Sequence, residues 1–196
     1  MKKRVAILIS GRGSNMTALI EAARSADYPA RIVGVFSNRP DAAGLETARA
    51  EGIPTAAISH KDYPSREAFD DAIQRVLEGW QTEIVCLAGF MRVLSAAFAE
   101  RWKGRMLNIH PSLLPLHRGL NTHQRALEAG DLEHGCTVHF VTPGLDEGPA
   151  ILNARIPVLP GDTAESLAAR VLIEEHRIYP EALAMVARGE ATLSER

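Results

Sequence analysis

The sequence predicts an α/β fold: a mostly parallel, twisted sheet with helices on both faces and an antiparallel C-terminal edge. The first observation is that short apolar runs alternate with helical patterns over much of the chain. Strands that alternate with helices across short turns form parallel sheets covered on both faces. The second is that two late apolar runs, 135–142 and 150–158, follow one another without a helix between them. Such runs can pair antiparallel.

The parallel part of the sheet is expected to contain short strands rich in aliphatic and β-branched residues. They lie at 4–10, 31–38, 54–59, 83–89 and 105–110. Apolar residues at helical spacing predict connecting helices at 14–25, 41–52, 65–80 and 95–102. Ser65 is the expected N-cap of the third helix, because its hydroxyl can accept a hydrogen bond from a free backbone N–H.

The pattern changes after Gly119. A helix is expected at 121–130, with Asn121 and Gln124 placed like a capping box. The two late strands then follow.

A long helical stretch over 162–189 completes the pattern. Asp162 can cap it, with Glu165 at the capping-box position, and Pro180 should end or kink it. No linker, repeat or low-complexity segment interrupts the elements, so we expect one domain over residues 1–196.

Composition argues against several classes of protein. The net charge of -2 does not favour a nucleic-acid partner, and no apolar stretch reaches the length of a membrane span. The first apolar run stops at Ile9, too short for a signal peptide. Cys86 and Cys136 lie in apolar runs and are expected to be buried free thiols. We therefore expect a cytoplasmic protein.

The turn "SGRGSN", residues 10–15, joins the first strand to the first helix. Glycines let the backbone approach a ligand closely, and the free N–H groups of a helix N-terminus attract anions. A dinucleotide site would need a glycine where Met16 stands, and an acid in "FSNR", residues 36–39. A small phosphate monoester fits better, although the glycines could equally serve turn geometry alone.

The segment "LNIHPSLLP", residues 107–115, places Asn108 and His110 two positions apart in a strand, so both face the same side. Pro111 keeps His110 extended. A side-chain amide beside an imidazole can stabilise an oxyanion. A polar pair that only caps the end of a strand is an equally good interpretation of the spacing alone.

The loop "TPGLDEGPA", residues 142–150, offers a carboxylate to this pair. If Asp146 reaches His110, it will orient the imidazole and favour its charged form. The alternative is that the acids of this loop are simply solvated. Cys136 and Ser112 are conceivable nucleophiles, but neither lies in a recognisable nucleophile motif.

Most of the histidines are concentrated in one region, which raises the question of zinc: His110, His117, His123, His134 and His139. Their spacings match no compact ligand motif, and no cysteine pair accompanies them. We therefore expect no metal site.

Six segments occur in the order seen in one enzyme family: "ISGRGSN", "LAGFMRVLS", "LNIHPSLLP", "GCTVHFVT", "LDEGP" and "EEHRIYP". On these segments the chain resembles the phosphoribosylglycinamide formyltransferase family. The resemblance implies a Rossmann-like formyltransferase fold. It also implies formyl transfer from 10-formyltetrahydrofolate to the amine of glycinamide ribonucleotide in purine biosynthesis. These two small molecules are the expected partners, and a monomer or a homodimer is the expected state.

The resemblance also implies roles for individual residues. The implied catalytic residues are Asn108, His110 and Asp146. The residues implied to bind the phosphate of the ribonucleotide are Gly11, Arg12, Gly13, Ser14 and Asn15, and Glu175 is implied to hold its ribose hydroxyls. The implied folate-binding residues are Met91, Arg92, Val93, Leu94, Thr142 and Asp146. Among them, 92–94 would contribute backbone contacts to the pterin.

Thr137, near the catalytic water, and His139 are implied as supporting residues, and the bond between Leu114 and Pro115 is implied to be cis. The chain departs from the family at "LHRGLNTH", residues 116–123, whose Arg-Gly is similar to methionyl-tRNA formyltransferase. Asn153 also stands where Gln is common.

Three other readings remain open. Methionyl-tRNA formyltransferase usually carries a C-terminal tRNA-binding domain, and formyltetrahydrofolate hydrolase an N-terminal regulatory domain. We expect neither here, because the sequence starts with a strand and closes on a long helix. A non-catalytic module that binds phosphate ligands is the third.

Overall fold

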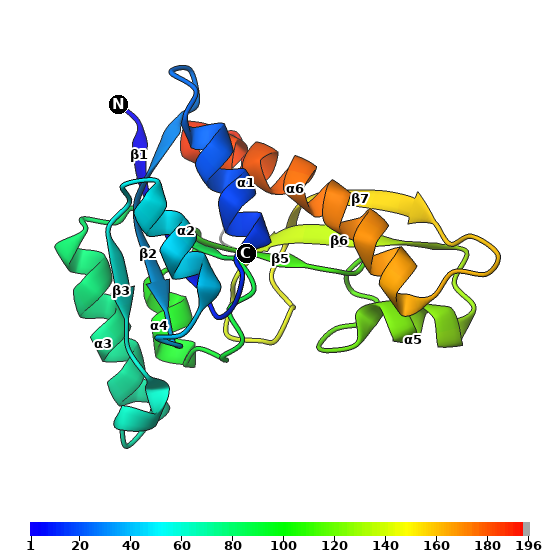
Figure 1. The fold of residues 1–196 in the computed structure, drawn as a ribbon, viewed down its shortest axis with the longest axis horizontal. Helices are drawn as coiled ribbons and strands as arrows, with labels where there is room; N and C mark the ends of the chain where they lie inside the picture. The colour runs from blue at the N-terminus through cyan, green and yellow to red at the C-terminus, as the bar shows by residue number, and fades with distance from the viewer. Residues whose placement is uncertain (194–196) are drawn as a thin grey trace.

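The computed structural model describes residues 1–193. A seven-stranded sheet runs through the molecule in the order β3-β2-β1-β4-β5-β6-β7 (Figure 1). Its strands are β1 (Lys3–Ile9), β2 (Ala30–Ser37), β3 (Thr55–Ala57), β4 (Ile84–Leu87), β5 (Met106–His110), β6 (Glu133–Phe140) and β7 (Ala150–Pro157). Neighbouring strands from β3 to β5 pair parallel, whereas β6 and β7 pair antiparallel. The predicted fold class is confirmed, including its antiparallel C-terminal edge.

Helices cover both faces of this sheet (Figure 1). They are α1 (Ser14–Ala23), α2 (Ala43–Ala50), α3 (Arg66–Gly79), α4 (Ala96–Arg101), α5 (Thr122–Ala129) and α6 (Ala164–Arg188), with a short 3₁₀ turn, η1, at His60–Asp62. Helices α1, α2 and α6 lie on one face, and α3 and α4 lie on the other. Within residues 1–193, no helix is both long and apolar enough to span a membrane.

The alternation of side chains along β1 explains this two-layer packing. Val5, Ile7 and Ile9 belong to the core cluster that contains residues of α1, α2 and α6. Ala6 and Leu8 belong to the second cluster, which contains residues of α3 and α4. All five are fully buried, as expected for a central parallel strand.

Two of the three predicted helix caps are wrong. The Ser65 hydroxyl does cap α3, since it accepts a hydrogen bond from the N–H of Ala68 over 3.1 Å. Asn121, however, is left-handed with φ 56° and makes no side-chain cap, so no capping box forms with Gln124. A capping asparagine normally needs an extended backbone to reach the first turn.

The start and course of α6 also differ from the prediction. Thr163, not Asp162, is the N-cap, and its capping-box partner is Ser166 rather than Glu165. Asp162 instead accepts hydrogen bonds from Leu159 N and from Arg170. The helix does not end at Pro180 but continues to Arg188.

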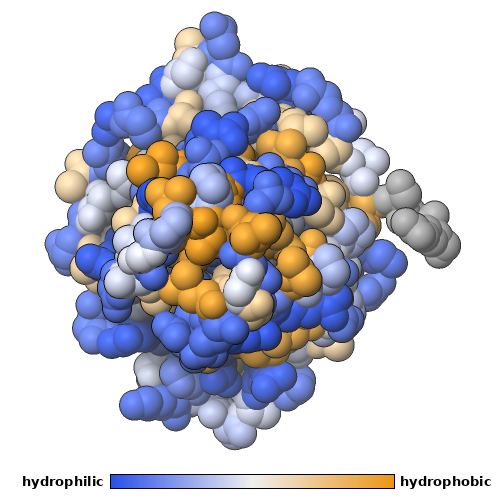
Figure 2. Space-filling model, turned by 90° about the vertical axis from the view of Figure 1, so that its right-hand side faces the viewer, coloured by the Kyte–Doolittle hydropathy of each residue, from blue (hydrophilic) through white to orange (hydrophobic). Residues whose placement is uncertain are grey.

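The β7 end of the sheet carries apolar side chains on its surface. Figure 2, which views the molecule from the right-hand side of Figure 1, shows apolar groups gathered on this face. Leu132 and Leu159 are among the exposed large hydrophobic residues. They precede β6 and follow β7, and the hydrogen bond from Val158 N to Leu132 O ties these two ends together.

Candidate active site

Asn108 and His110 project from β5 on the side opposite to the α6 layer. Leu107 and Ile109 belong to the core cluster that contains residues of α6, so the residues between and after them face the other side. This agrees with the strand alternation deduced from the spacing. Across the antiparallel pairing with β6, Asn108 lies opposite His139, and His110 lies opposite Thr137. Two of the predicted catalytic residues and both supporting residues therefore come from two paired strands.

Asp146 reaches this pair from the loop between β6 and β7. Its Oδ2 lies 3.4 Å from Nδ1 of His110, and its Oδ1 lies 3.8 Å from Nε2 of His139. The backbone of Asp146 is left-handed, with φ 52°, a conformation that asparagine and aspartate tolerate better than most residues. The N–H of Gly119 donates to Oδ2 over 3.0 Å, which helps to hold the carboxylate in place.

His139 is neutral in this arrangement. Burial lowers its pKa, although the Phe140 carbonyl and the Asp146 charge oppose that shift. Nδ1 of His139 lies 2.9 Å from the Phe140 carbonyl, which can only accept, so Nδ1 carries the proton. Nε2 is then an acceptor, and the side-chain amide of Asn108 donates to it over 3.3 Å.

The second nitrogen of His110 is also engaged. Nε2 lies 2.9 Å from the main-chain carbonyl of His117, so it donates to that oxygen. His117 is left-handed, with φ 50°, and its own Nε2 lies 2.6 Å from Oδ2 of Asp131. The loop after β5 thus covers His110, and the contact of the His117 side chain with Asp131 holds this loop in place.

The loop after β5 and the β6–β7 loop are tied together at the surface. Arg118 donates to Glu147 over 3.2 Å, next to the bond between Gly119 and Asp146. Arg118 belongs to the segment in which the sequence departs from the resembled family. In this structure it therefore contacts the loop that carries Asp146.

The glycine-rich turn lies at the carboxyl end of β1, in front of α1. Gly13 has φ +70°, which favours glycine, and it provides no side chain to cap the helix. The first N–H groups of α1 therefore remain available to an anion. A cavity of about 200 Å³ is formed here by residues of the turn together with Ala88 and Gly89. Its lining includes all five predicted phosphate-binding residues: Gly11, Arg12, Gly13, Ser14 and Asn15.

Glu175 of α6 lies beside this turn. Its Oε2 accepts a hydrogen bond from the side-chain amide of Asn15 over 3.1 Å. Burial raises the pKa of Glu175, and the bond from Asn15 partly opposes that rise. A residue predicted to hold ribose hydroxyls thus contacts a residue predicted to hold the phosphate.

The predicted folate-binding residues occupy two segments. Met91 and Val93 are exposed, at 68% and 55%, in the connection from β4 to α4, whereas Arg92 and Leu94 are half-buried. Since β4 pairs with β5 so that Leu87 lies opposite Asn108, this connection starts beside the β5 residues of the site. Thr142 is half-buried in the β6–β7 loop that carries Asp146.

Thr137 is committed to the turn after His110. Its hydroxyl donates to the Ser112 carbonyl over 2.8 Å and accepts from Leu114 N over 3.1 Å. Its single proton is therefore used within the protein. The bond between Leu114 and Pro115 is cis, as the resemblance implied.

Neither candidate nucleophile is placed for attack. Ser112 is fully buried and donates to the Leu116 carbonyl over 2.6 Å. Cys136 is fully buried, and burial raises the pKa of its thiol to about 12. Covalent catalysis by either residue has no support in this geometry.

The remaining histidines of the region form a separate group behind His110. Nδ1 of His123 lies 3.1 Å from Nε2 of His134, and the rings of His117 and His134 meet edge-on at 6.3 Å. Burial, followed by the nearby His123, lowers the pKa of His134 to about 4. Across residues 1–193, no group of three or more His, Cys, Asp or Glu side chains is arranged to hold a metal ion.

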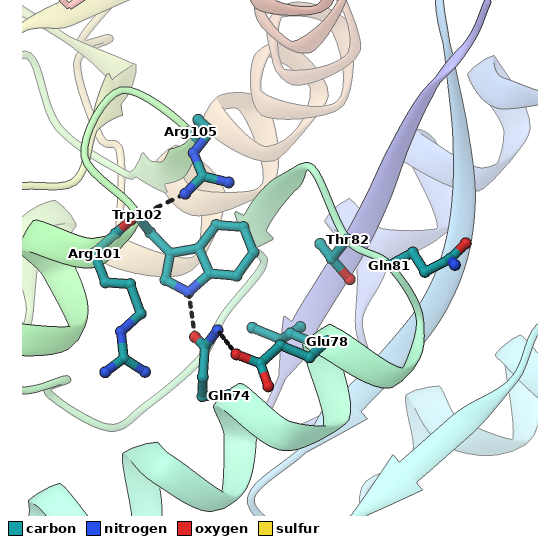
Figure 3. Close-up of a pocket in the computed structure, with 8 residues that line it drawn as sticks. Gln74, Glu78, Gln81, Thr82, Arg101, Trp102 and Arg105 are labelled. Atoms are coloured by element: carbon teal, nitrogen blue, oxygen red, sulfur yellow. Dashed lines mark hydrogen bonds between the residues drawn. The ribbon is translucent and has the colours of Figure 1, made fainter.

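A larger cavity, of about 310 Å³, lies elsewhere (Figure 3). Residues at the end of α3, before β4 and at the end of α4 line it, so it opens at the amino ends of the strands. Trp102 donates to Gln74 over 2.9 Å, and the guanidinium of Arg105 lies 4.6 Å from the indole ring. None of the predicted site residues contributes to it, so we assign the chemistry to the carboxyl ends of the strands instead.

The sequence did not reveal three contributors to the site. They are the carbonyl of His117, the N–H of Gly119 and the carboxylate of Asp131, which holds His117. The first two act through the backbone, so their side chains carry no signal. The glycine in "HRGLN", residues 117–121, was the one available hint of a special backbone in this loop.

Comparisons with known proteins show the family to which the chain is related. A family model described as formyl transferase matches residues 3–183. The phosphoribosylglycinamide formyltransferase of Escherichia coli K12 is 47% identical over 97% of this chain and 90% of its own length. The trifunctional purine biosynthetic protein adenosine-3 of Bos taurus is 54% identical over 99% of this chain. The chain spans only 19% of that bovine protein.

Solved structures give the same result. A phosphoribosylglycinamide formyltransferase from Brucella melitensis superimposes with a TM-score of 0.92 at 55% identity, covering 99% of this chain and 100% of that one. The enzyme from Coxiella burnetii superimposes with a TM-score of 0.95 at 46% identity, covering 100% and 92%. With a family model that matches nearly all of its length, the chain belongs to the formyl transferase family.

Proposed function

We propose that the protein transfers the formyl group of 10-formyltetrahydrofolate to the amine of glycinamide ribonucleotide, a step of purine biosynthesis. Relatives with this printed activity match almost the whole chain at 44% to 47% identity. The observation that carries the proposal is that Asn108, His110 and Asp146 lie together at the end of β5, while the glycine-rich turn follows β1, which is separated from β5 by β4 alone. Both substrates are small molecules, and the reaction is proposed to need no metal.

The chemistry that suits this geometry is direct attack without a covalent enzyme intermediate. The amine of the acceptor attacks the formyl carbon, and a C–N bond forms as the carbonyl oxygen becomes an oxyanion. Asn108 and protonated His110 donate hydrogen bonds to that oxyanion. The bond to N10 of the folate then breaks, and the proton lost by the amine ends on that nitrogen. Asp146 orients the His110 ring through Nδ1 and assists this transfer through an ordered water.

The contact between His110 and His117 adds one requirement to the scheme. Nε2 of His110 already donates to the carbonyl of His117, an acceptor of the same kind as a formyl oxygen. For His110 to serve the reaction through Nε2, the substrate oxygen replaces this carbonyl. The loop after β5 therefore shifts when the substrates bind.

The acceptor would lie over the glycine-rich turn, beside Glu175 of α6. Its phosphate would meet the free N–H groups of the turn at residues 11–15, and its ribose hydroxyls would meet Glu175. The folate would lie against Met91–Leu94 and Thr142, which border the trio from two sides.

We also propose a cytoplasmic location, which two buried free thiols, Cys86 and Cys136, support. A monomer or a homodimer remains our prediction.

A spectroscopic assay of folate deformylation tests the proposal. Purified protein is mixed with 10-formyltetrahydrofolate, and absorbance is followed with and without glycinamide ribonucleotide. Turnover that depends on the acceptor is the expected result. Turnover without it would indicate a formyltetrahydrofolate hydrolase, and transfer to methionyl-tRNA instead would indicate the other formyltransferase. Binding of the ribonucleotide with no turnover would indicate a non-catalytic module.

A further inference from the structure

The connection from β4 to α4 presents free backbone groups beside the candidate active site. The peptide groups of residues 92–94 make no main-chain hydrogen bond that is seen within the described chain, residues 1–193. Met91 and Val93 turn their side chains to solvent. An irregular segment with unpaired peptides can bind a ligand through its backbone, but only if something else fixes its shape.

A buried side chain fixes the start of this segment. The N–H of Met91 donates to the hydroxyl oxygen of Ser10 over 2.8 Å. The Ser10 hydroxyl in turn donates to Oδ1 of Asn38 over 2.6 Å. Ser10 and Asn38 are both buried and directly follow β1 and β2, so the carboxyl ends of these two strands hold the start of the segment.

A second buried side chain fixes the end of the segment. Oδ2 of Asp70, on α3, accepts the N–H of Ser95 over 2.7 Å. Ser95 is the N-cap of α4, and its hydroxyl accepts the N–H of Phe98. Asp70 therefore joins α3 to the point where the segment ends and α4 begins.

Asp70 is an unusual residue for a helix that packs on a sheet. Its side chain is only 2% exposed, and charged residues are rarely buried so fully without a partner. Burial raises its pKa, against the hydrogen bonding of Ser95 and the charges of Arg92 and Arg66. Within residues 1–193, its Oδ1 has no hydrogen-bond partner, and neither does the buried Nε of Arg92. The guanidinium of Arg92 lies 5.2 Å from the ring of Phe69, the neighbour of Asp70.

We propose that Asp70 is a positioning residue for the folate: it holds residues 92–94 in the shape that presents their free peptide groups to the co-substrate. The inference rests on the proposed function. Asp70 does not touch the reacting atoms, and it acts through the N–H of Ser95. Its loss should therefore weaken folate binding and leave the ribonucleotide site, which is built on α1 and α6, unchanged.

The experiment compares Asp70→Ala with the wild type in steady-state assays that vary each substrate separately. The Michaelis constant for 10-formyltetrahydrofolate should rise about tenfold, the effect of losing one hydrogen bond to a charged group. The Michaelis constant for glycinamide ribonucleotide should stay within about twofold, since the side-chain hydrogen bond of Asp70 joins it to Ser95 and not to α1 or α6. Titration calorimetry with tetrahydrofolate, the product, should show the same weakening.

Two further variants separate positioning from general stability. Asp71→Ala removes the same charge from the next residue of α3, which is exposed, and should leave both constants unchanged. Asp70→Asn keeps a carbonyl oxygen to accept the N–H of Ser95 and should hold the folate constant within about threefold of wild type.

The outcomes discriminate clearly. An unchanged folate constant in Asp70→Ala overturns the inference, and so does an equal rise in both Michaelis constants. Asp70→Asn behaving like Asp70→Ala also overturns it, because the retained acceptor would then be irrelevant. Failure of the wild type to transfer formyl groups would instead reject the proposed function. In that event calorimetry with tetrahydrofolate still tests the role of Asp70 in binding.

Discussion

The side-chain amide of Asn108 donates a hydrogen bond to Nε2 of His139 over 3.3 Å, across the paired strands β5 and β6. His139 accepts this bond because its own proton is held on Nδ1 by the Phe140 carbonyl. The lowered pKa of buried His139 keeps the ring neutral. The amide of Asn108 is thus turned in one direction, and its second N–H remains to meet a substrate oxygen.

The first prediction concerns this amide. Asn108→Ala should reduce kcat by about 10²–10³, the usual cost of removing one oxyanion donor. The fold should persist, as checked by circular dichroism, because the change removes no core side chain. Asn153→Ala provides the control, since Asn153 is an exposed amide on β7. A kcat of Asn108→Ala equal to that of the control would contradict the assigned role.

The second prediction concerns the carboxylate. Asp146→Asn should lose at least about 10² in kcat, because the carboxylate that faces Nδ1 of His110 and assists proton transfer is replaced by an amide. Asparagine tolerates the left-handed backbone of this position, so the loop should keep its shape. Glu147→Gln, a neighbouring and exposed acid, is the matched control. Near-wild-type turnover of Asp146→Asn would reject the mechanism.

The third prediction separates the two substrates. Glu175→Ala should raise the Michaelis constant for glycinamide ribonucleotide about tenfold, as expected for a lost charged hydrogen bond, and spare that for the folate. The next residue, Glu174, pairs with Arg177 at the surface, so Glu174→Ala is the control. Steady-state kinetics with each substrate varied would show the difference. A larger effect on the Michaelis constant for the folate would contradict the placement of Glu175 in the ribonucleotide site.

Much of the fold could be predicted because local signals agree with the global arrangement. The helix over 66–79 illustrates this, since its apolar spacing and its Ser65 cap both follow from the sequence. Asn121 illustrates the limit. Its residue type and spacing suit a capping box, but the chain there adopts a left-handed backbone that no local pattern revealed. Tertiary contacts of the loop decide that conformation.

The site was predictable in part. Strand alternation correctly put Asn108 and His110 on one side, but spacing alone could not join them to Asp146, which lies far along the chain. The resemblance supplied that link. The engagement of His110 by the His117 carbonyl could not be predicted, since it depends on the path of a loop and uses backbone atoms.

The fourth prediction concerns the support beneath the site. The buried hydroxyl of Tyr179 lies 2.8 Å from the carbonyl of Leu87, the last residue of β4. It also lies 3.2 Å from the carbonyl of Leu107, within β5. Tyr179→Phe leaves these oxygens without that donor and should cost about 1–3 kcal/mol of unfolding free energy. Tyr63→Phe, at a half-buried tyrosine on the other face, is the control. Urea titration measures both, and equal stabilities would contradict the prediction.

The fifth prediction concerns acid stability. The pKa of buried His134 is lowered to about 4, whereas a histidine in the unfolded chain titrates near 6.5. Between about pH 6.5 and 4 the unfolded chain therefore binds a proton at this residue that the folded protein does not. Its contribution to stability is present above about pH 6.5 and is lost as the pH falls toward 4.

When the pH is lowered from 7.5 to about 5, the melting temperature of the wild type should accordingly fall further than that of His134→Asn. Comparing the two proteins is necessary because other buried groups also titrate. The pKa values of Asp70 and Glu175 are raised, so these carboxyls stabilise the fold as the pH falls and oppose the histidine. The difference between the two curves reports His134 together with the His123 ring that it contacts, because both proteins keep these acids. Parallel melting curves over the whole range would show that His134 does not couple folding to protonation.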